Sequence, residues 1–334
     1  MKQFVFSLVA LAAALAASAQ SGYKLVNTFH VASPGGWDYA LCDAANNRLY
    51  LSHATQVNIL NATTGDSVGV ITGTTGVHGI AVVHDLGKGY TSNGKLNAVT
   101  VFDLKSGKIQ GQISVGKNPD WIMYDEASKR VITSNHSGGD ISLIDPSKDQ
   151  VVATISLDGA KLETIASDGA GKLFVNAEDK NEIVVVDLAA QKVVAHWPLG
   201  AEGPTGLAID VKNKRLFATC EKELVVVDAT NGHVVTKVPI GAGTDGTVFD
   251  VDNKLILTAN GEGTITAVKQ VSKDEYKVVE TIQTKRGAKT ITINQATHTI
   301  YLPTADFEAL PAGATAGTRP KIKDGTFQVL VLKK

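Results

Sequence analysis

The sequence predicts an all-β fold, a seven-bladed β-propeller with four antiparallel strands in each blade. The first observation is a repeat: an apolar strand ending in Asp or Asn returns at intervals of 42, 42, 42 and 41 residues. The second is that each repeat holds four short apolar stretches separated by turn residues, a pattern typical of propeller blades. The third is a strand-like segment before the first repeat, which would complete the last blade.

Taken in chain order, the marker strands predict one blade each. A sixth, degenerate copy ends in Lys269, and the seventh follows 63 residues later because an insertion interrupts the last repeat. Runs of β-branched residues in these strands fit positions that are covered on both faces. The seven markers are Val57–Asn61, Val99–Asp103, Ile141–Asp145, Ile183–Asp187, Leu224–Asp228, Ile265–Lys269 and Val329–Leu332.

The two ends of the repeat region predict how the ring closes. Lys24–Val31 precedes all repeats but reads like a fourth strand such as Lys192–Leu199, whereas the last repeat stops after its third strand, Val329–Leu332. We therefore expect the N-terminal strand to close the last blade, so that each blade packs on two neighbours. An open β-solenoid or two β-sandwiches are the alternatives, and neither needs a displaced fourth strand.

The first 19 residues have the pattern of a secretory signal peptide. A lysine at position 2 is followed by the apolar stretch Phe4–Ala17 and the small-residue site Ala17–Ala19. The apolar stretch is short for a membrane-spanning helix. We therefore expect a signal peptide at residues 1–19, a single propeller domain at 20–334 with an insertion at about 304–326, and a periplasmic or secreted protein.

Charge and cysteine usage exclude several classes of partner. The net charge is −1 with both signs mixed, so the strongly basic surface of a dedicated nucleic-acid binder is not expected. No apolar run of 18 residues occurs outside the signal, so a membrane span is not expected either. The two cysteines, Cys42 and Cys220, fall in blades one and five. Because those blades lie apart in the ring, we expect free thiols. We also expect a monomer.

Blade three resembles the YVTN-type β-propeller repeat through Val131–Asn135, Ile141–Asp145 and Val151–Ile155. Blades two, four and five are similar to it, and the chain after the signal resembles YncE-like exported propellers. The resemblance implies the seven-bladed fold but says little about function, because propellers serve as binding proteins, surface proteins and enzymes. It also allows nucleic-acid binding, which the near-neutral charge disfavours.

Aligned repeats place one residue of each blade at the mouth of the central channel. A polar, water-filled funnel is one interpretation of these residues. However, carboxylates that converge in a narrow space repel one another unless a cation or a basic ligand lies among them. The first-strand positions are Asp38, His78, Asp120, Glu163, Thr205, Asp245 and Lys289, and the second-strand ends include His53, Asn93, Asn135, His136, Glu178, Glu221, Asn260 and Asp306.

Eight members of this group are the candidate ligand-binding residues: Asp38, His78, Asp120, Glu163, Asp245, Lys289, Glu178 and Glu221. The candidate metal ligands are His53, His78, His136 and Asp120. Imidazole with carboxylate suits Zn, Ni or Cu, while carboxylate with Asn would suit Ca. The cofactor is otherwise unknown, since no short-spaced metal motif and no nucleophile or dinucleotide motif occurs.

These residues favour a non-enzymatic exported propeller that binds a small ligand, a metal ion or a protein partner at its axial face. The insertion Phe307–Pro320 should emerge on that face, as binding loops and lids often do. The alternative is a metal-assisted hydrolase of the lactonase kind on the same face. There an ion held by Asp38, Asp120, Glu163 or Asp245 would polarise a carbonyl, and His78 would move protons.

Overall fold

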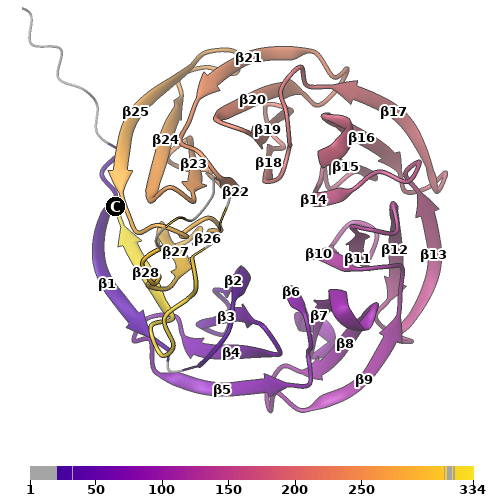
Figure 1. Ribbon diagram of the computed structural model, residues 1–334. Helices are drawn as coiled ribbons and strands as arrows, with labels where there is room; N and C mark the ends of the chain where they lie inside the picture. Colours follow the sequence, from indigo (N-terminus) through magenta and orange to yellow (C-terminus); the bar gives the residue numbers. More distant parts are fainter. Residues whose placement is uncertain (1–20, 32, 312, 314–317, 319) are drawn as a thin grey trace, which may run out of the picture.

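The computed structural model describes residues 21–31, 33–311, 313, 318 and 320–334. The signal peptide predicted at residues 1–19 lies outside them. In the described part, 28 strands form seven four-stranded antiparallel sheets arranged as a ring around a central channel (Figure 1). The seven-bladed propeller predicted from the repeat is confirmed.

Each of the first six blades is built from four consecutive strands. Blades one to three contain β2 (Trp37–Asp43), β3 (Arg48–His53), β4 (Gln56–Asn61), β5 (Ser67–Thr72); β6 (Val77–Val83), β7 (Lys88–Asn93), β8 (Ala98–Asp103), β9 (Ile109–Ser114); and β10 (Pro119–Asp125), β11 (Arg130–Asn135), β12 (Asp140–Asp145), β13 (Gln150–Ser156). Blades four to six contain β14 (Leu162–Ser167), β15 (Lys172–Ala177), β16 (Glu182–Asp187), β17 (Lys192–Pro198); β18 (Leu207–Asp210), β19 (Arg215–Cys220), β20 (Glu223–Asp228), β21 (Val234–Pro239); and β22 (Thr244–Asp250), β23 (Leu255–Asn260), β24 (Thr264–Gln270), β25 (Tyr276–Gln283).

Blade seven combines the two ends of the described chain. Its strands are β26 (Thr292–Asn294), β27 (Thr299–Thr304), β28 (Gln328–Lys333) and β1 (Lys24–His30), and β1 pairs antiparallel with β28. Figure 1 shows indigo β1 beside yellow β28. The predicted closure by the N-terminal strand is confirmed.

Burial follows the position of a strand in its blade. Third strands such as β20 are buried over four consecutive residues because neighbouring blades cover both faces. The fourth strand β17 instead alternates exposed and half-buried residues, since one face meets solvent. The marker Asp at the end of the third strand stabilises the turn that follows. Asp103, the last residue of β8, accepts hydrogen bonds from the amide and the hydroxyl of Ser106, at 2.7 and 2.6 Å. Asn61 does the same for the amides of Thr63 and Thr64.

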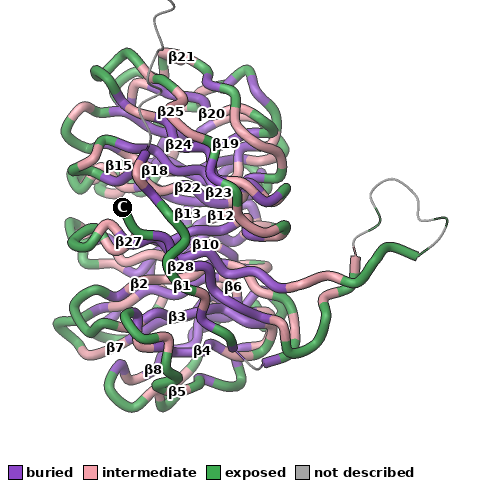
Figure 2. The backbone as a smooth tube through the Cα atoms, turned by 90° about the vertical axis from the view of Figure 1, so that its left-hand side faces the viewer, coloured by how far each residue is buried: buried purple, intermediate pink, exposed green. Residues whose placement is uncertain are grey.

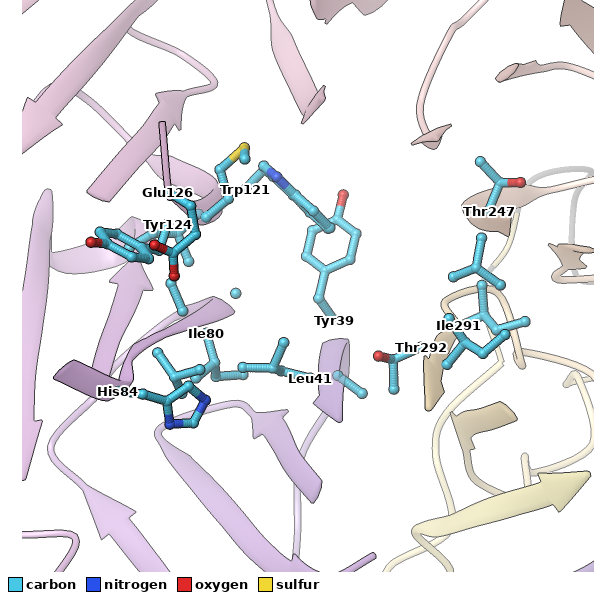
Figure 3. Close-up of a pocket in the computed structure, with 18 residues that line it drawn as sticks. Tyr39, Leu41, Ile80, His84, Trp121, Tyr124, Glu126, Thr247, Ile291 and Thr292 are labelled. Atoms are coloured by element: carbon cyan, nitrogen blue, oxygen red, sulfur yellow. The ribbon is translucent and has the colours of Figure 1, made fainter. Parts of the chain in front are cut away.

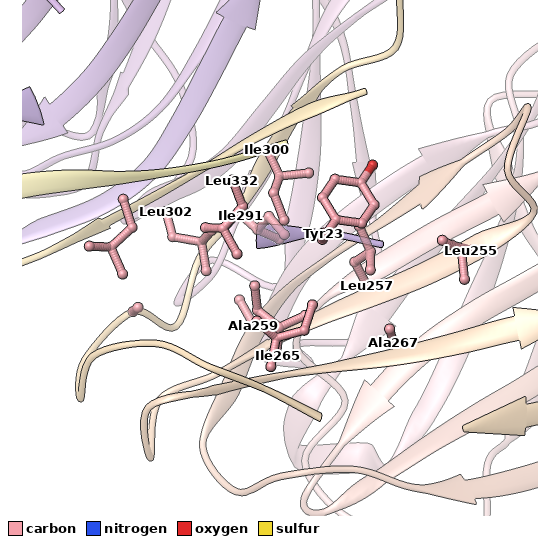
Figure 4. Close-up of a cluster of buried hydrophobic side chains, with 13 residues drawn as sticks. Tyr23, Leu255, Leu257, Ala259, Ile265, Ala267, Ile291, Ile300, Leu302 and Leu332 are labelled. Carbon is pink, nitrogen blue, oxygen red and sulfur yellow. The ribbon is translucent and has the colours of Figure 1, made fainter. Parts of the chain in front are cut away.

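The ring closure is anchored by two aromatic residues. Tyr23 packs among side chains of blades six and seven, including Leu257 and Leu332 (Figure 4), and its hydroxyl donates a 2.6 Å hydrogen bond to Asp250. Phe29 belongs to a second buried cluster that joins blade seven to blade one. The clasp is therefore held by side-chain packing as well as by the β1–β28 ladder.

Both cysteines are free, as predicted, and burial raises the pKa of each thiol to about 12. Three short 3₁₀ helices, η1 (His84–Leu86), η2 (Gly94–Leu96) and η3 (Glu178–Lys180), lie in turns. Within the described residues, no helix has the length and apolar character needed to cross a bilayer.

The blade-seven insertion lies between β27 and β28. Phe307 bridges Ile322, and the amide of Glu308 donates to the carbonyl of Lys321 at 2.8 Å, so the base of the insertion is a narrow hairpin. Figure 2 shows this segment projecting well beyond the body of the ring, on one face.

Candidate functional site

Five of the seven predicted channel-mouth residues lie on innermost strands, and the other two lie just before such strands. Each of the five is the second residue of its strand: Asp38 in β2, His78 in β6, Asp120 in β10, Glu163 in β14 and Asp245 in β22. Thr205 precedes β18 and Lys289 precedes β26. In Figure 1 these strand ends surround the central opening.

A break in strand register coincides with each of the five strand residues. The pairing of first and second strands shifts between Trp37 and Ala40 in blade one and between Pro119 and Ile122 in blade three, with similar shifts in blades two, four and six. β-bulges of this kind re-aim side chains and are common beside functional sites. Here they lie at the residues that converge on the channel.

Asp38, His78 and Asp120 form the first group, from blades one to three. Nδ1 of His78 lies 2.7 Å from an oxygen of Asp38 and 3.7 Å from Oδ1 of Asp120. One donor atom from each residue lies within 4.8 Å of the other two. Ligands bound to one ion through bonds of about 2.0–2.2 Å lie about 3 to 3.5 Å apart, so small movements of these side chains would bring the three donors to that spacing.

Asp120, His136 and Glu163 form the second group and share Asp120 with the first. Nδ1 of His136 lies 3.1 Å from Oε1 of Glu163 and 3.1 Å from the carbonyl of Leu162. The three donor atoms again lie within 4.8 Å of one another. Asp120 therefore lies between the two imidazoles.

Asp120 is the least compensated of these groups. It is only 9% exposed, and its Oδ1 has no hydrogen-bond partner among the described residues. Burial, followed by the negative charge of Asp38, raises the pKa of the Asp120 carboxyl well above its usual value. A buried carboxylate in such surroundings costs stability unless a cation accompanies it.

The two histidines face the carboxylates of the two groups, and these carboxylates raise the pKa of both imidazoles. The hydrogen bond with Glu163 raises the pKa of His136 to about 9, although burial opposes the shift. Burial lowers the pKa of His78, but the hydrogen bond with Asp38 and the charges of Asp120 and Glu163 outweigh it, so that the net shift is upward. Burial also raises the pKa of Glu163.

Asp245 is neutralised on the opposite side of the channel. Its carboxylate forms an ion pair with the ammonium of Lys289, which neighbouring acids reinforce by raising the pKa of that lysine despite its burial. Among the described residues, no lysine or arginine forms such an ion pair with Asp120, although the charges of Asp38 and Asp120 also raise the pKa of Lys289.

Tyr39 lies in the channel next to these groups. Its ring meets Trp121 edge-on at 4.8 Å, and burial, followed by the charge of Asp120, raises the pKa of its hydroxyl well above 10. The same two aromatic residues line a largely apolar cavity of about 420 Å³ in the channel (Figure 3), together with side chains such as Leu41, Ile80 and Ile291. Tyr39 thus belongs both to the charged site and to the apolar cavity.

Besides Asp245 and Lys289, three predicted residues lie outside the two groups. His53 is fully buried; its Nδ1 meets the hydroxyl of Ser33, its Nε2 lies 2.8 Å from the carbonyl of Gly35, and its ring stacks on Phe327 at 4.0 Å. Both ring nitrogens of His53 are thus engaged with the segment before β2 and lie outside the two groups. Glu178 is half-buried at the start of η3, and Glu221 is exposed after β19.

A second cavity, of about 470 Å³, lies between the channel mouth and the base of the insertion. Its walls include Trp37, Phe307, Arg286 and Lys289. The rings of Trp37 and Phe307 are 6.0 Å apart, and the guanidinium of Arg286 lies 5.9 Å from the centre of the Phe307 ring. The insertion base is thus beside the axial residues, as the sequence predicted.

Sequence reasoning missed Tyr39. The residue directly follows Asp38 in β2, and regular alternation would direct the two side chains to opposite faces. The register shift at this point removes that alternation. No feature of the repeat itself marks the shift.

Comparison with known proteins supports the fold. No family model matches the chain. The uncharacterized protein YncE of Escherichia coli O157:H7 and that of strain K12 are each 23% identical to it over 159 residues, covering 42% of this chain and 45% of YncE. Hydrazine synthase of Kuenenia stuttgartiensis superimposes with a TM-score of 0.69 and 17% identity, over 82% of this chain and 94% of that chain.

The match to YncE spans less than half the length of those proteins, and the likeness to hydrazine synthase concerns the fold alone. Together with the seven sheets and the closure by β1, these similarities support a seven-bladed β-propeller that is similar to YncE over part of its length.

Proposed function

We propose that this chain is an exported, non-enzymatic binding propeller that holds a divalent transition-metal ion among Asp38, His78 and Asp120 at its axial face. The observation that carries the proposal is the buried Oδ1 of Asp120, which lacks a hydrogen-bond partner and faces the imidazole of His78 at 3.7 Å. A cation at this position would satisfy that oxygen. Export rests on the signal-like pattern of residues 1–19.

The donor types select the class of ion. Imidazole nitrogen combined with carboxylate oxygen suits Zn²⁺, Ni²⁺ or Cu²⁺, whereas Ca²⁺ takes six to eight oxygen ligands. Three protein ligands would leave a further coordination position for water or for a small ligand. The axial face could therefore present a bound ion to a small molecule or to a partner protein.

The test is zinc binding by the purified chain after removal of metals with EDTA. Isothermal titration calorimetry with ZnCl₂ should show saturable binding, and the stoichiometry or the affinity should fall in His78→Ala. His196→Ala is the matched control, because His196 also lies 2.7 Å from a carboxylate, Glu182, but on the outer surface. Absence of saturable binding, or equal loss in both variants, would overturn the proposal.

One observation favours the hydrolase alternative. The cavity bounded by Trp37, Phe307, Arg286 and Lys289 includes Trp37, the chain neighbour of Asp38, and offers aromatic and basic walls to an organic anion. An ion with an open coordination position could polarise a carbonyl there. Turnover in a lactone panel that disappears with EDTA and with Asp120→Asn would favour the enzyme, while zinc binding without turnover would favour the binding protein.

A further inference from the structure

The two groups of potential ligands are complete and nearly independent. Each has its own imidazole and its own terminal carboxylate: His78 with Asp38 in the first group, His136 with Glu163 in the second. They come from different blades and share only Asp120. A site designed for one ion would need only one of these sets.

We infer that Asp120 bridges two divalent ions, one in each group, so that the axial site is dinuclear; this inference rests on the function proposed above. A carboxylate has two oxygens and can bind one ion with each. Two-metal sites place their ions about 3.5–4 Å apart, close enough for one carboxylate to bind both. Each group offers one donor atom from each of its three residues, and these atoms lie within 4.8 Å of one another.

The surroundings of Asp120 fit a bridging role. It is nine-tenths buried, one of its oxygens has no hydrogen-bond partner, and no lysine or arginine forms an ion pair with it among the described residues. The other carboxylates lie closer to their cationic partners: Asp38 and Glu163 lie 2.7 and 3.1 Å from a histidine nitrogen and Asp245 pairs with Lys289, whereas Oδ1 of Asp120 lies 3.7 Å from Nδ1 of His78. Asp120 alone belongs to both groups.

The strand geometry places Asp120 between the two histidines. It lies in β10 of blade three, where the register shifts between Pro119 and Ile122. His78 enters from blade two, while His136 follows β11 of the same blade as Asp120. The bulge thus presents the carboxylate to both imidazoles at once.

Zinc stoichiometry tests the inference. Native mass spectrometry of the EDTA-treated chain titrated with zinc acetate should show two ions per chain. His78→Ala and His136→Ala should each retain one zinc ion, and the control His196→Ala should retain two. Asp120→Asn should bind both zinc ions at least tenfold more weakly. Near-UV circular dichroism checks that each variant is folded.

The failure of this inference is distinguishable from failure of the proposed function. If the wild-type chain binds one zinc ion, Asp120 does not bridge two ions, although the proposed binding function still holds. If it binds none, both the bridging role and the proposed binding function are wrong. Loss of both ions in a single-histidine variant would also contradict separate positions. A measurement on the unaltered chain gives a second criterion: electron paramagnetic resonance after Mn²⁺ loading should show an exchange-coupled pair, and isolated Mn²⁺ signals alone would refute it.

Discussion

Asp120→Asn should change the stability of the protein in opposite directions without and with zinc. In the metal-free chain Asp120 is buried beside Asp38, and these surroundings raise the pKa of its carboxyl well above its usual value. A group with a raised carboxyl pKa contributes stability at low pH and loses it as the pH rises, so ionised Asp120 costs stability at neutral pH. Asparagine has nearly the same shape and no charge.

The size of the effect follows from the burial of one unsatisfied atom. A buried polar atom without a partner costs about 1–3 kcal/mol, and more when it is charged. Asparagine keeps the buried polar atom but removes the charge, so we expect a gain of roughly 1–2 kcal/mol, which raises Tm by about 2–6 °C. With zinc at 1,000 times its Kd, the wild-type chain should gain about 4 kcal/mol and become the more stable of the two.

Thermal unfolding at pH 7.5, followed by circular dichroism with EDTA and then with ZnCl₂, measures both differences. Asp245→Asn is the control, because it leaves the half-buried ammonium of Lys289 without its partner and should lower Tm in both conditions. The reasoning is refuted if Asp120→Asn lowers Tm in EDTA, or if zinc stabilises the variant as much as the wild-type chain.

Three further predictions concern the ring closure and the thiols. Tyr23→Phe removes the 2.6 Å hydrogen bond to Asp250 and should cost about 1.5–3 kcal/mol in urea unfolding. Burial alone would raise the pKa of Asp250, but hydrogen bonds from Tyr23 and Asn253 lower it overall. The stability that this carboxylate contributes is therefore present above the ordinary pKa of Asp and is lost as the pH falls through its pKa in the folded protein. Tyr23→Phe should accordingly move the midpoint of acid unfolding to higher pH, and an unchanged midpoint would contradict this. Phe29→Ala empties a buried position between blades seven and one and should cost about 3–5 kcal/mol, and a loss under 1 kcal/mol would mean that the clasp contributes little. Ellman titration of the unfolded, unreduced protein should find two thiols, Cys42 and Cys220, whereas none would indicate a disulfide.

Sequence reasoning predicted the fold well because the fold is periodic. The strand that precedes the first repeat and the missing fourth strand of the last one are both visible in the sequence, and the observed pairing of Lys24 with Lys333 and of His30 with Gln328 completes that blade. The same period placed Asp38, His78 and Asp120 at equivalent positions, which the structure brings together.

The parts of the site that were not predictable depend on side-chain direction. The register shifts near Asp38 and Asp120 turn these carboxylates toward the channel and bring Tyr39 beside them, although the repeat gives no sign of a bulge. His53 occupies the expected end of β3, yet its hydrogen bonds with Ser33 and Gly35 come from the segment before blade one. Such local contacts lie outside any repeat pattern.

Anomalous diffraction at the zinc absorption edge, from crystals of the purified chain grown with ZnCl₂, tests the central claim most directly. We expect a strong peak bound by a nitrogen of His78 and by oxygens of Asp38 and Asp120, with a second peak beside His136 and Glu163. A map with no peak at Asp120, or with peaks only at surface histidines such as His196, would contradict the account.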